Sequence, residues 1–194
     1  PKIANKNIYI SKLDLQNEEN VKKYIKSIEK DLTKVVVINF AAYKDDSLII
    51  NQDLSSWEKA FKVNTSSNFL VAKYVLPIML KNKWGRFIHI SSERGLRGSA
   101  GSTAYGASKA ALIGLSRSMA KEYARFGISS NVLSLGYFDS GLYRKLDDKL
   151  KKDFIKGVPS KKLGSAEDIF YAIDFLISSD YTNGSVITID GCME

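Results

Sequence analysis

Short apolar runs alternate along this chain with longer segments whose apolar residues recur at helical spacing. Fully buried strands of a parallel sheet are unbroken apolar runs, and residues 35–38 form such a run. The same pattern predicts further strands over residues 8–10, 87–90, 128–135 and 186–189. Strands that alternate with helices are typical of βα units around a parallel sheet, so we predict an α/β fold.

Helices are predicted between these strands, over residues 21–32, 55–80, 103–126 and 166–178. Pro77 predicts a kink or an early end of the second helix, because proline lacks the N–H that a helix needs. Gly127 ends the third, since glycine tolerates the left-handed conformation that closes many helices. No repeat, low-complexity tract or linker interrupts this order, so residues 1–194 are predicted to form a single domain.

Composition narrows the classes of protein that fit. The chain has 194 residues, 44% of them hydrophobic and 26% charged, which is the balance of a globular domain. No apolar run approaches the roughly 20 residues that cross a bilayer. No signal peptide is recognisable either, so we expect a cytoplasmic protein without membrane contact. One cysteine excludes an internal disulfide, and with only one histidine no metal site is predicted.

The net charge of +8 is compatible with nucleic acid or with an anionic ligand. The lysines are scattered over predicted helices and turns rather than gathered into one basic segment, so no nucleic-acid partner is predicted. A phosphate-bearing cofactor or an acidic carrier would gain from the same charge.

The strongest chemical signal is Tyr105 followed four residues later by Lys109, with Ser92 thirteen residues before Tyr105. Residues four apart share one face of a helix, so the Lys109 ammonium can approach the Tyr105 phenol. A nearby cation favours the ionised form of a phenol, whose pKa is otherwise about 10. Ser92 follows a predicted strand, at the edge where open α/β sheets bind ligands. We predict an acid/base pair of Tyr105 and Lys109, with the Ser92 hydroxyl on a carbonyl oxygen or its alkoxide.

Residues 90–95 (Ile-Ser-Ser-Glu-Arg-Gly) and 105–112 (Tyr-Gly-Ala-Ser-Lys-Ala-Ala-Leu) resemble the short-chain dehydrogenase/reductases, most closely the bacterial β-ketoacyl-acyl-carrier-protein reductase type. The resemblance extends over nearly the whole chain. It implies a Rossmann-like, doubly wound parallel sheet with helices on both faces, and hydride transfer between NAD(P) and a carbonyl or alcohol. It makes Ser92, Tyr105 and Lys109 catalytic, with Lys109 also holding the nicotinamide ribose. A fourth residue, Asn64, would support a water-linked proton relay to Lys109.

The resemblance also implies a set of residues that contact the cofactor. Asp14 and Leu15 resemble the family's acidic residue that contacts adenine and its neighbour. Residues 39–42 (Asn-Phe-Ala-Ala) resemble its Asn-Asn-Ala-Gly turn, in which Ala42 replaces a glycine and makes a positive φ less accessible. Residues 135–140 resemble the stretch that lies against the nicotinamide carboxamide. The cofactor residues so implied are Asp14, Leu15, Asn39, Ala41, Tyr105, Lys109, Gly136, Phe138 and Ser140.

A Rossmann domain normally opens with a strand, a Gly-rich turn and a helix whose amino end takes the pyrophosphate. These residues contain no such opening, so at least one βαβ unit of roughly 30 residues is expected to be missing ahead of Pro1. Either the sequence is a fragment of a longer protein, which we favour, or it is a natural short form. On its own it is expected to bind NAD or NADP weakly or not at all, and the preference between them stays open.

An acyl-carrier-protein thioester leads as the substrate, because the resemblance is closest there. An acidic carrier could be steered by Lys81, Lys83, Arg86 and Arg125. Glu93 and Arg94 beside Ser92 favour a polar or anionic ligand. The alternative enzymatic substrate is a keto sugar of a surface-glycan pathway. Residues 141–157 are predicted to form an amphipathic flap over the site, with an ordinary surface helix as the alternative.

A non-catalytic relative that serves as a binding or assembly module is the alternative from another class. Members of the family form dimers and tetramers, and small residues in the helix 103–126 would let two copies approach, so a homo-dimer or homo-tetramer is expected. These small residues are Ala107, Ala110, Ala111, Gly114 and Ser118. We interpret His89 as a hydrogen-bonded core residue and Cys192 as an inert thiol. The direction of the reaction stays open.

Overall fold

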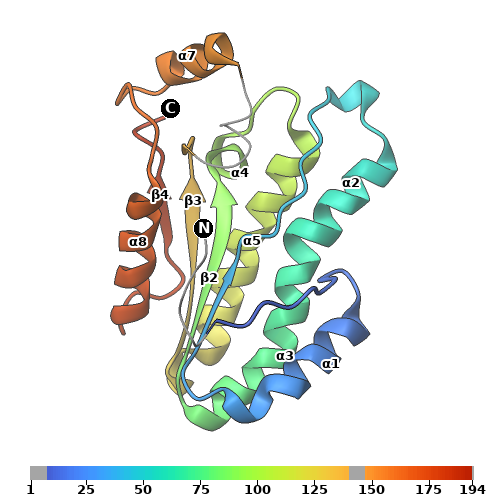
Figure 1. Ribbon diagram of the computed structural model, residues 1–194, viewed down its shortest axis with the longest axis vertical. Coiled ribbons are helices and arrows are strands. Elements are labelled where there is room, and N and C mark those ends of the chain that lie inside the picture. Colours follow the sequence, from blue (N-terminus) through green and yellow to red (C-terminus); the bar gives the residue numbers. More distant parts are fainter. Residues whose placement is uncertain (1–7, 140–146, 194) are drawn as a thin grey trace.

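The computed structural model describes residues 8–139 and 147–193. Four parallel strands form one sheet in the order β1-β2-β3-β4, with β2 and β3 at its centre (Figure 1). Every residue of β2 is buried, as expected for a strand covered on both faces. The strands span Val35–Asn39, Gly85–Ser92, Ile128–Leu135 and Val186–Ile189, which confirms four of the predicted strands.

Helices cover both faces of this sheet (Figure 1). On one face α1 (Glu18–Ile28), α3 (Ser67–Asn82) and α5 (Thr103–Tyr123) enclose the larger apolar core. On the other face α8 (Ala166–Ser178) packs against β2, β3 and β4 through the buried Leu176. The predicted Rossmann-like α/β arrangement is therefore confirmed. Three shorter helices complete the described chain: α2 (Leu54–Phe61), α4 (Glu93–Arg97) and α7 (Asp148–Gly157).

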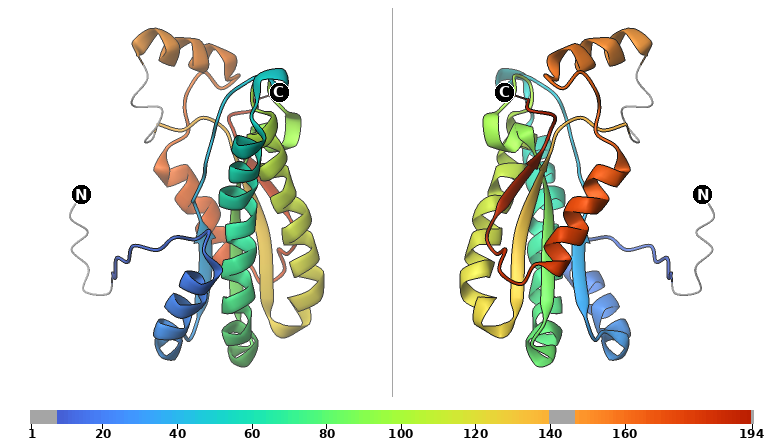
Figure 2. Two further views of the ribbon diagram at one scale, coloured as in Figure 1. Left: turned by 90° about the vertical axis from the view of Figure 1, so that its right-hand side faces the viewer. Right: turned by 90° about the vertical axis from the view of Figure 1, so that its left-hand side faces the viewer.

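Two predictions about local structure are wrong. Residues 8–10 form no strand, because they run away from the sheet and have no neighbouring backbone to pair with (Figure 2). The helix predicted over 55–80 is divided by a π-helical turn at Lys62–Ser66, whereas Pro77 lies inside α3 without ending it. The apolar burial of Leu76, Ile78 and Met79 around Pro77 offsets the hydrogen bond that proline cannot make.

The path of α5 brings its first turn to the carboxyl edge of the sheet. The helix and a short 3₁₀ turn end at Gly127, which has a φ of 74° and returns the chain into β3. A Cβ at this position would overlap the carbonyl oxygen of Lys83, so only glycine allows the close approach to the start of β2. Because β2 and β3 run antiparallel to α5, the carboxyl ends of the strands and the amino end of α5 lie together (Figure 1).

The predicted flap is only partly described. Tyr143 and Leu146 lie outside the described residues, and α7 forms the remainder of that segment. Within it the Phe154 ring packs edge-on against Tyr137, with 4.8 Å between the ring centroids, while Leu150 is exposed. None of the described helices is long and apolar enough to cross a membrane. Within residues 8–139 and 147–193, histidine, cysteine and acidic side chains do not gather into a group that could hold a metal ion.

Candidate active site

Ser92, Tyr105 and Lys109 meet at the carboxyl edge of the sheet. Ser92 is the last residue of β2 and the N-cap of α4, where its Oγ accepts a hydrogen bond from the Arg94 N–H. Tyr105 lies in the first turn of α5, and Lys109 follows one turn later on the same face. The Ser91 hydroxyl donates to the Lys109 carbonyl at 2.9 Å, which fixes the helix against the end of β2. The structure thus brings together the three residues that the spacing predicts as catalytic.

The Tyr105 phenol is largely shielded from solvent and hydrogen-bonds with the Ser92 side chain. Burial raises the pKa of this phenol, and the hydrogen bond with Ser92 and the positive charge of Arg94 oppose the rise only in part. Tyr105 therefore holds its proton at neutral pH. A phenol in this state can donate a proton to an oxygen that gains negative charge.

Lys109 is nearly inaccessible, and its Nζ donates to the carbonyl oxygen of Ile90 at 2.7 Å. The Nζ lies 5.8 Å from the centroid of the Tyr105 ring. Burial lowers the pKa of this ammonium to about 8. Arg94 is a cation whose charge lowers the pKa of the Tyr105 phenol, and the effect of desolvation outweighs it. That Lys109 makes Tyr105 more acidic stays a prediction.

Asn64 lies in the π-helical turn and is completely buried. Its Oδ1 accepts from the Tyr43 N–H at 2.7 Å, and its Nδ2 donates to the Tyr43 carbonyl and to the Ser108 Oγ. Asn64 therefore joins the segment after β1 to the residue that precedes Lys109. The hydrogen bonds of its side chain go to Tyr43 and Ser108 rather than to Lys109.

The predicted cofactor residues after β1, Asn39 and Ala41, are hydrogen-bonded to each other. The Asn39 side chain accepts from the Ala41 N–H at 2.9 Å and donates to the Ser67 hydroxyl at 3.2 Å. The side chain of Asn39 thus stabilises the turn. The backbone around Ala41 is the part of the turn that remains to contact a ligand. Ala42 does not adopt the positive φ that a glycine would allow.

The predicted cofactor residues after β3 pack against the C-terminal segment. A Cβ on Gly136 would come within 2.7 Å of the Asp190 Cα, so the loop needs glycine for this close approach. The Phe138 ring is buried against Gly164, and both line a cavity of about 190 Å³ that also reaches Asp190. Ser140 lies outside the described residues.

Asp14 and Leu15 precede α1, apart from the other predicted residues. The Asp14 carboxylate is exposed and accepts from the Gln16 N–H at 3.0 Å, while Leu15 packs against the larger core. Their contact with adenine stays a prediction.

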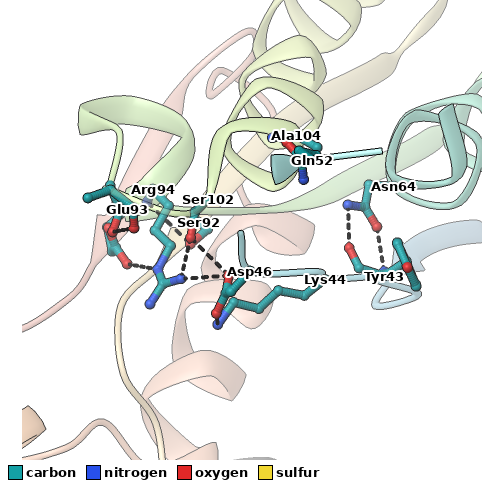
Figure 3. A network of polar contacts seen from close by, with 12 residues as sticks. Tyr43, Lys44, Asp46, Gln52, Asn64, Ser92, Glu93, Arg94, Ser102 and Ala104 are labelled. Carbon is teal, nitrogen blue, oxygen red and sulfur yellow. Dashed lines mark hydrogen bonds and ion pairs between the residues drawn. The ribbon is translucent and has the colours of Figure 1, made fainter. Parts of the chain in front are cut away.

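A charged network beside Ser92 was only partly foreseen from the sequence. Glu93 and Arg94 were expected at the ligand side, but their partners Lys44, Asp46 and Ser102 come from distant segments (Figure 3). Asp46 and Ser102 are 56 residues apart, so no spacing rule connects them. Burial works to raise the pKa of Asp46, yet hydrogen bonds from Lys44 and Ser102 hold it below its usual value.

The donor set fits the ribose of a nicotinamide nucleotide. An ammonium has three N–H donors, and within the described residues Lys109 uses one of them, on Ile90. The other two are available at the carboxyl edge of the sheet, where open α/β folds bind nucleotides. A Rossmann-like sheet with this set of polar groups defines the class of nucleotide-dependent α/β enzymes.

Comparison with known proteins specifies the class. The family described as Enoyl-(Acyl carrier protein) reductase matches residues 2–194. The chain is 33% identical to Nodulation protein G of Azospirillum brasilense over 186 residues, covering 94% of this chain and 76% of that protein. It is 34% identical over 184 residues to the 3-oxoacyl-[acyl-carrier-protein] reductase of Buchnera aphidicola subsp. Schizaphis graminum, covering 93% and 75%. With its counterpart from Chlamydia muridarum the identity is 38% over 160 residues, covering 81% and 64%.

The chain belongs to the short-chain dehydrogenase/reductase family. It is an oxidoreductase of this family, with a cofactor of the NAD(P) type.

Proposed function

We propose that the protein reduces a carbonyl group with hydride from NAD(P)H and that Tyr105 donates the proton. The observation that carries this proposal is the meeting of Ser92, Tyr105 and Lys109 at the carboxyl edge of the sheet. A phenol whose pKa is raised by burial suits the donor of a reduction better than the base of an oxidation.

In the proposed reaction a bound nicotinamide cofactor would supply the hydride for the carbonyl carbon. The Ser92 hydroxyl turns from Tyr105 to the substrate oxygen and stabilises its developing charge. Tyr105 gives its proton to that oxygen. Lys109 binds the ribose hydroxyls with its two remaining N–H donors, and Asn64 holds the π-helical turn through which a water chain would return a proton.

A 3-oxoacyl thioester on acyl carrier protein is the proposed substrate, supported by the names of the relatives. Lys81, Lys83 and Arg125 are exposed and remain candidates to attract the acidic carrier, although they lie at the amino end of β2, opposite Ser92. Arg86 does not belong to this set, because it is buried and its guanidinium pairs with Asp180. Its predicted steering role is therefore wrong.

A hydroxylated substrate such as a keto sugar is the second candidate. The charged side chains around Ser92 favour it, since Lys44, Asp46, Glu93 and Arg94 offer donors and acceptors rather than an apolar wall. NAD and NADP both remain candidates. A homo-dimer or homo-tetramer also remains a proposal. It is supported by α5, where nothing lies within 4 Å of a Cβ built on Gly114.

The substitution Tyr105→Phe tests the proposal. It removes the proton donor and keeps the ring, so turnover of NAD(P)H with a 3-oxoacyl thioester should fall by at least about 100-fold. The protein expressed from its complete coding sequence is assayed by the loss of absorbance of the reduced cofactor. Tyr123→Phe, at the opposite end of α5, is the matched control and should keep its rate.

Two results would count against the proposal. Full turnover in Tyr105→Phe would remove Tyr105 as the donor. A wild-type protein that binds its partners but oxidises no NAD(P)H with either substrate class would favour the binding-module alternative.

A further inference from the structure

The Ser102 hydroxyl at the start of α5 is engaged outside its own helix. Ser102 occupies the N-cap position, where serine usually accepts from a backbone N–H of the first turn, yet it makes no such bond. Its Oγ instead accepts from Arg94 Nη1 at 2.6 Å and donates to Asp46 Oδ1 at 3.0 Å. The directions are determined, because a guanidinium can only donate and a carboxylate can only accept. Ser102 itself is 2% exposed.

These contacts bring three segments of the site to one point (Figure 3). Arg94 belongs to α4 and binds Ser92 through its backbone N–H. Ser102 begins the helix that carries Tyr105, and Asp46 lies in the segment after β1, beside Lys44. A backbone bridge between Ser47 and Ser102 joins the same two segments.

The fit between α4 and α5 leaves little freedom at this point. A Cβ on Gly106 would come within 2.8 Å of the Arg94 carbonyl oxygen, so the backbone of α4 rests directly on the turn that holds Tyr105. The Arg94 side chain is mostly covered, with 13% of it exposed, and its Nε also faces Glu93 at 3.5 Å. A change in the position of the guanidinium must therefore move α5 or break its contacts.

We propose that Arg94 is a positioning residue of the reductase, which through Ser102 and Asp46 fixes Tyr105 relative to Ser92. The expected effect of Arg94 on turnover rests on the proposed function. The expected effect of Arg94 on Tyr105 does not depend on which substrate is reduced. Lys109 has a different role, because its ammonium is directed to Ile90.

The charges around the Tyr105 hydroxyl make the inference sharply testable. Arg94 favours the phenolate, whereas Glu93 and Asp46 disfavour it, and Ser92 contributes a hydrogen bond. Lys109 lies over the ring. Loss of the Arg94 charge should therefore raise the pKa of Tyr105, and loss of the Asp46 charge should lower it.

The experiment follows the ionisation of Tyr105 in protein labelled with 3-fluorotyrosine, whose phenol ionises at lower pH than that of tyrosine. The ¹⁹F resonance of residue 105 is assigned by its absence in Tyr105→Phe, and its shift is followed against pH. We expect Arg94→Met to move the midpoint upward and Asp46→Asn to move it downward. Arg94→Lys should lie nearer to wild type. Arg97→Met is the matched control, because Arg97 lies in the same helix but pairs with Asp190.

Loosening of the shared contacts alone would move both variants in the same direction, whereas the loss of opposite charges adds shifts of opposite sign. A shift in either variant shows that the pair acts on Tyr105, and no shift in either variant would overturn the inference. Circular dichroism identifies a variant that fails to fold. If Arg94→Met does so, the shift in Asp46→Asn still reports whether the pair acts on Tyr105.

The position of the helix is tested without a change of charge by Ser102→Ala and Ser102→Thr. We expect Ser102→Ala to lose about tenfold in kcat, because small displacements of a reacting group are costly, with the KM of the cofactor little changed. Ser102→Thr keeps the hydroxyl and should recover most of the rate. Unchanged kcat in Ser102→Ala would overturn the positioning role. If wild-type protein shows no turnover the proposed function fails, while the fluorine titration still decides the role of Arg94.

Discussion

Single residues in this site owe their protonation states to burial more than to their neighbours. The raised pKa of Tyr105 and the lowered pKa of Lys109 both follow from the cost of a charge in a poorly solvated place. The raised pKa keeps a proton on the Tyr105 phenol at neutral pH. The lowered pKa means that the Lys109 ammonium loses its proton at an unusually low pH.

Lys109 should impose an alkaline limit on the reaction. Because its pKa in the folded protein is lowered to about 8, its positive charge is lost as the pH rises through that value. We expect kcat/KM, which reports groups of the free enzyme, to fall above pH about 8. Lys109→Arg, which keeps its charge to much higher pH, should retain a lower activity without this limb.

The measurement is a pH profile of kcat/KM for both proteins. A wild-type profile that stays flat well above the pKa of Lys109 would contradict the assignment. The same limb in Lys109→Arg would assign it to another group.

Among the elements, the π-helical turn between α2 and α3 has the clearest connection to the site. The extra residue in this turn points Asn64 toward α5 and lets it bind both polar groups of Tyr43. Thr65 uses the next position to donate to the Ser108 carbonyl at 2.8 Å. Two adjacent residues thus connect the segment after β1 with the helix that carries Lys109.

Asn64→Ala should destabilise the protein by about 2–4 kcal/mol, because it leaves the N–H and carbonyl of Tyr43 without partners in a partly buried place. Thr65→Val has nearly the same shape as the original residue and loses one hydrogen bond, so about 1 kcal/mol is expected. Urea unfolding of both variants measures the difference. Equal losses would show that Asn64 does not support the turn in the way described.

At the scale of the whole molecule, a chain of buried polar groups crosses the core beside β2. Asn68 donates to the Asn64 carbonyl, so its Oδ1 must accept from His89 Nδ1. His89 Nε2 then accepts from the Ser130 hydroxyl. These partners assign the neutral form of His89, and burial lowers its pKa to about 4.

Global stability should therefore fall with acid in a defined window. The unfolded chain takes up a proton at His89 near its ordinary pKa of 6.5, and the folded protein resists it until about pH 4. Between these values the contribution of His89 to the free energy of unfolding should decrease by about 3 kcal/mol. Above pH 6.5 the contribution of His89 is constant.

The comparison variant is His89→Gln, which offers one donor and one acceptor but does not titrate in this range. Unfolding by urea at several pH values should give a difference between the two proteins that changes across the window. A constant difference would show that His89 is not held neutral in the fold.

Much of the fold could be predicted from the sequence, and the predictions that failed did so for physical reasons. Strands such as β2 are recognisable because burial on both faces demands an apolar run, and the end of α5 is recognisable because Gly127 must adopt a positive φ. The π-helical turn was missed because its residues continue the helical periodicity. Asp46 and Ser102 were missed because only tertiary structure brings them together.

The pKa of Tyr105 shows the same limit. Spacing identified the Tyr105–Lys109 pair, but the direction of the shift depends on burial and on Arg94, and neither can be inferred from spacing alone.

The contact between Gly136 and Asp190 gives the tail of the chain an unexpected importance. Asp190 touches the loop after β3 and also pairs with Arg97 at 2.8 Å, so the residues after β4 connect that loop to α4, the helix that begins beside Ser92. Proteolytic trimming at that point, or a bulky fusion placed there, would loosen the loop after β3 and α4 together without altering Ser92, Tyr105 or Lys109.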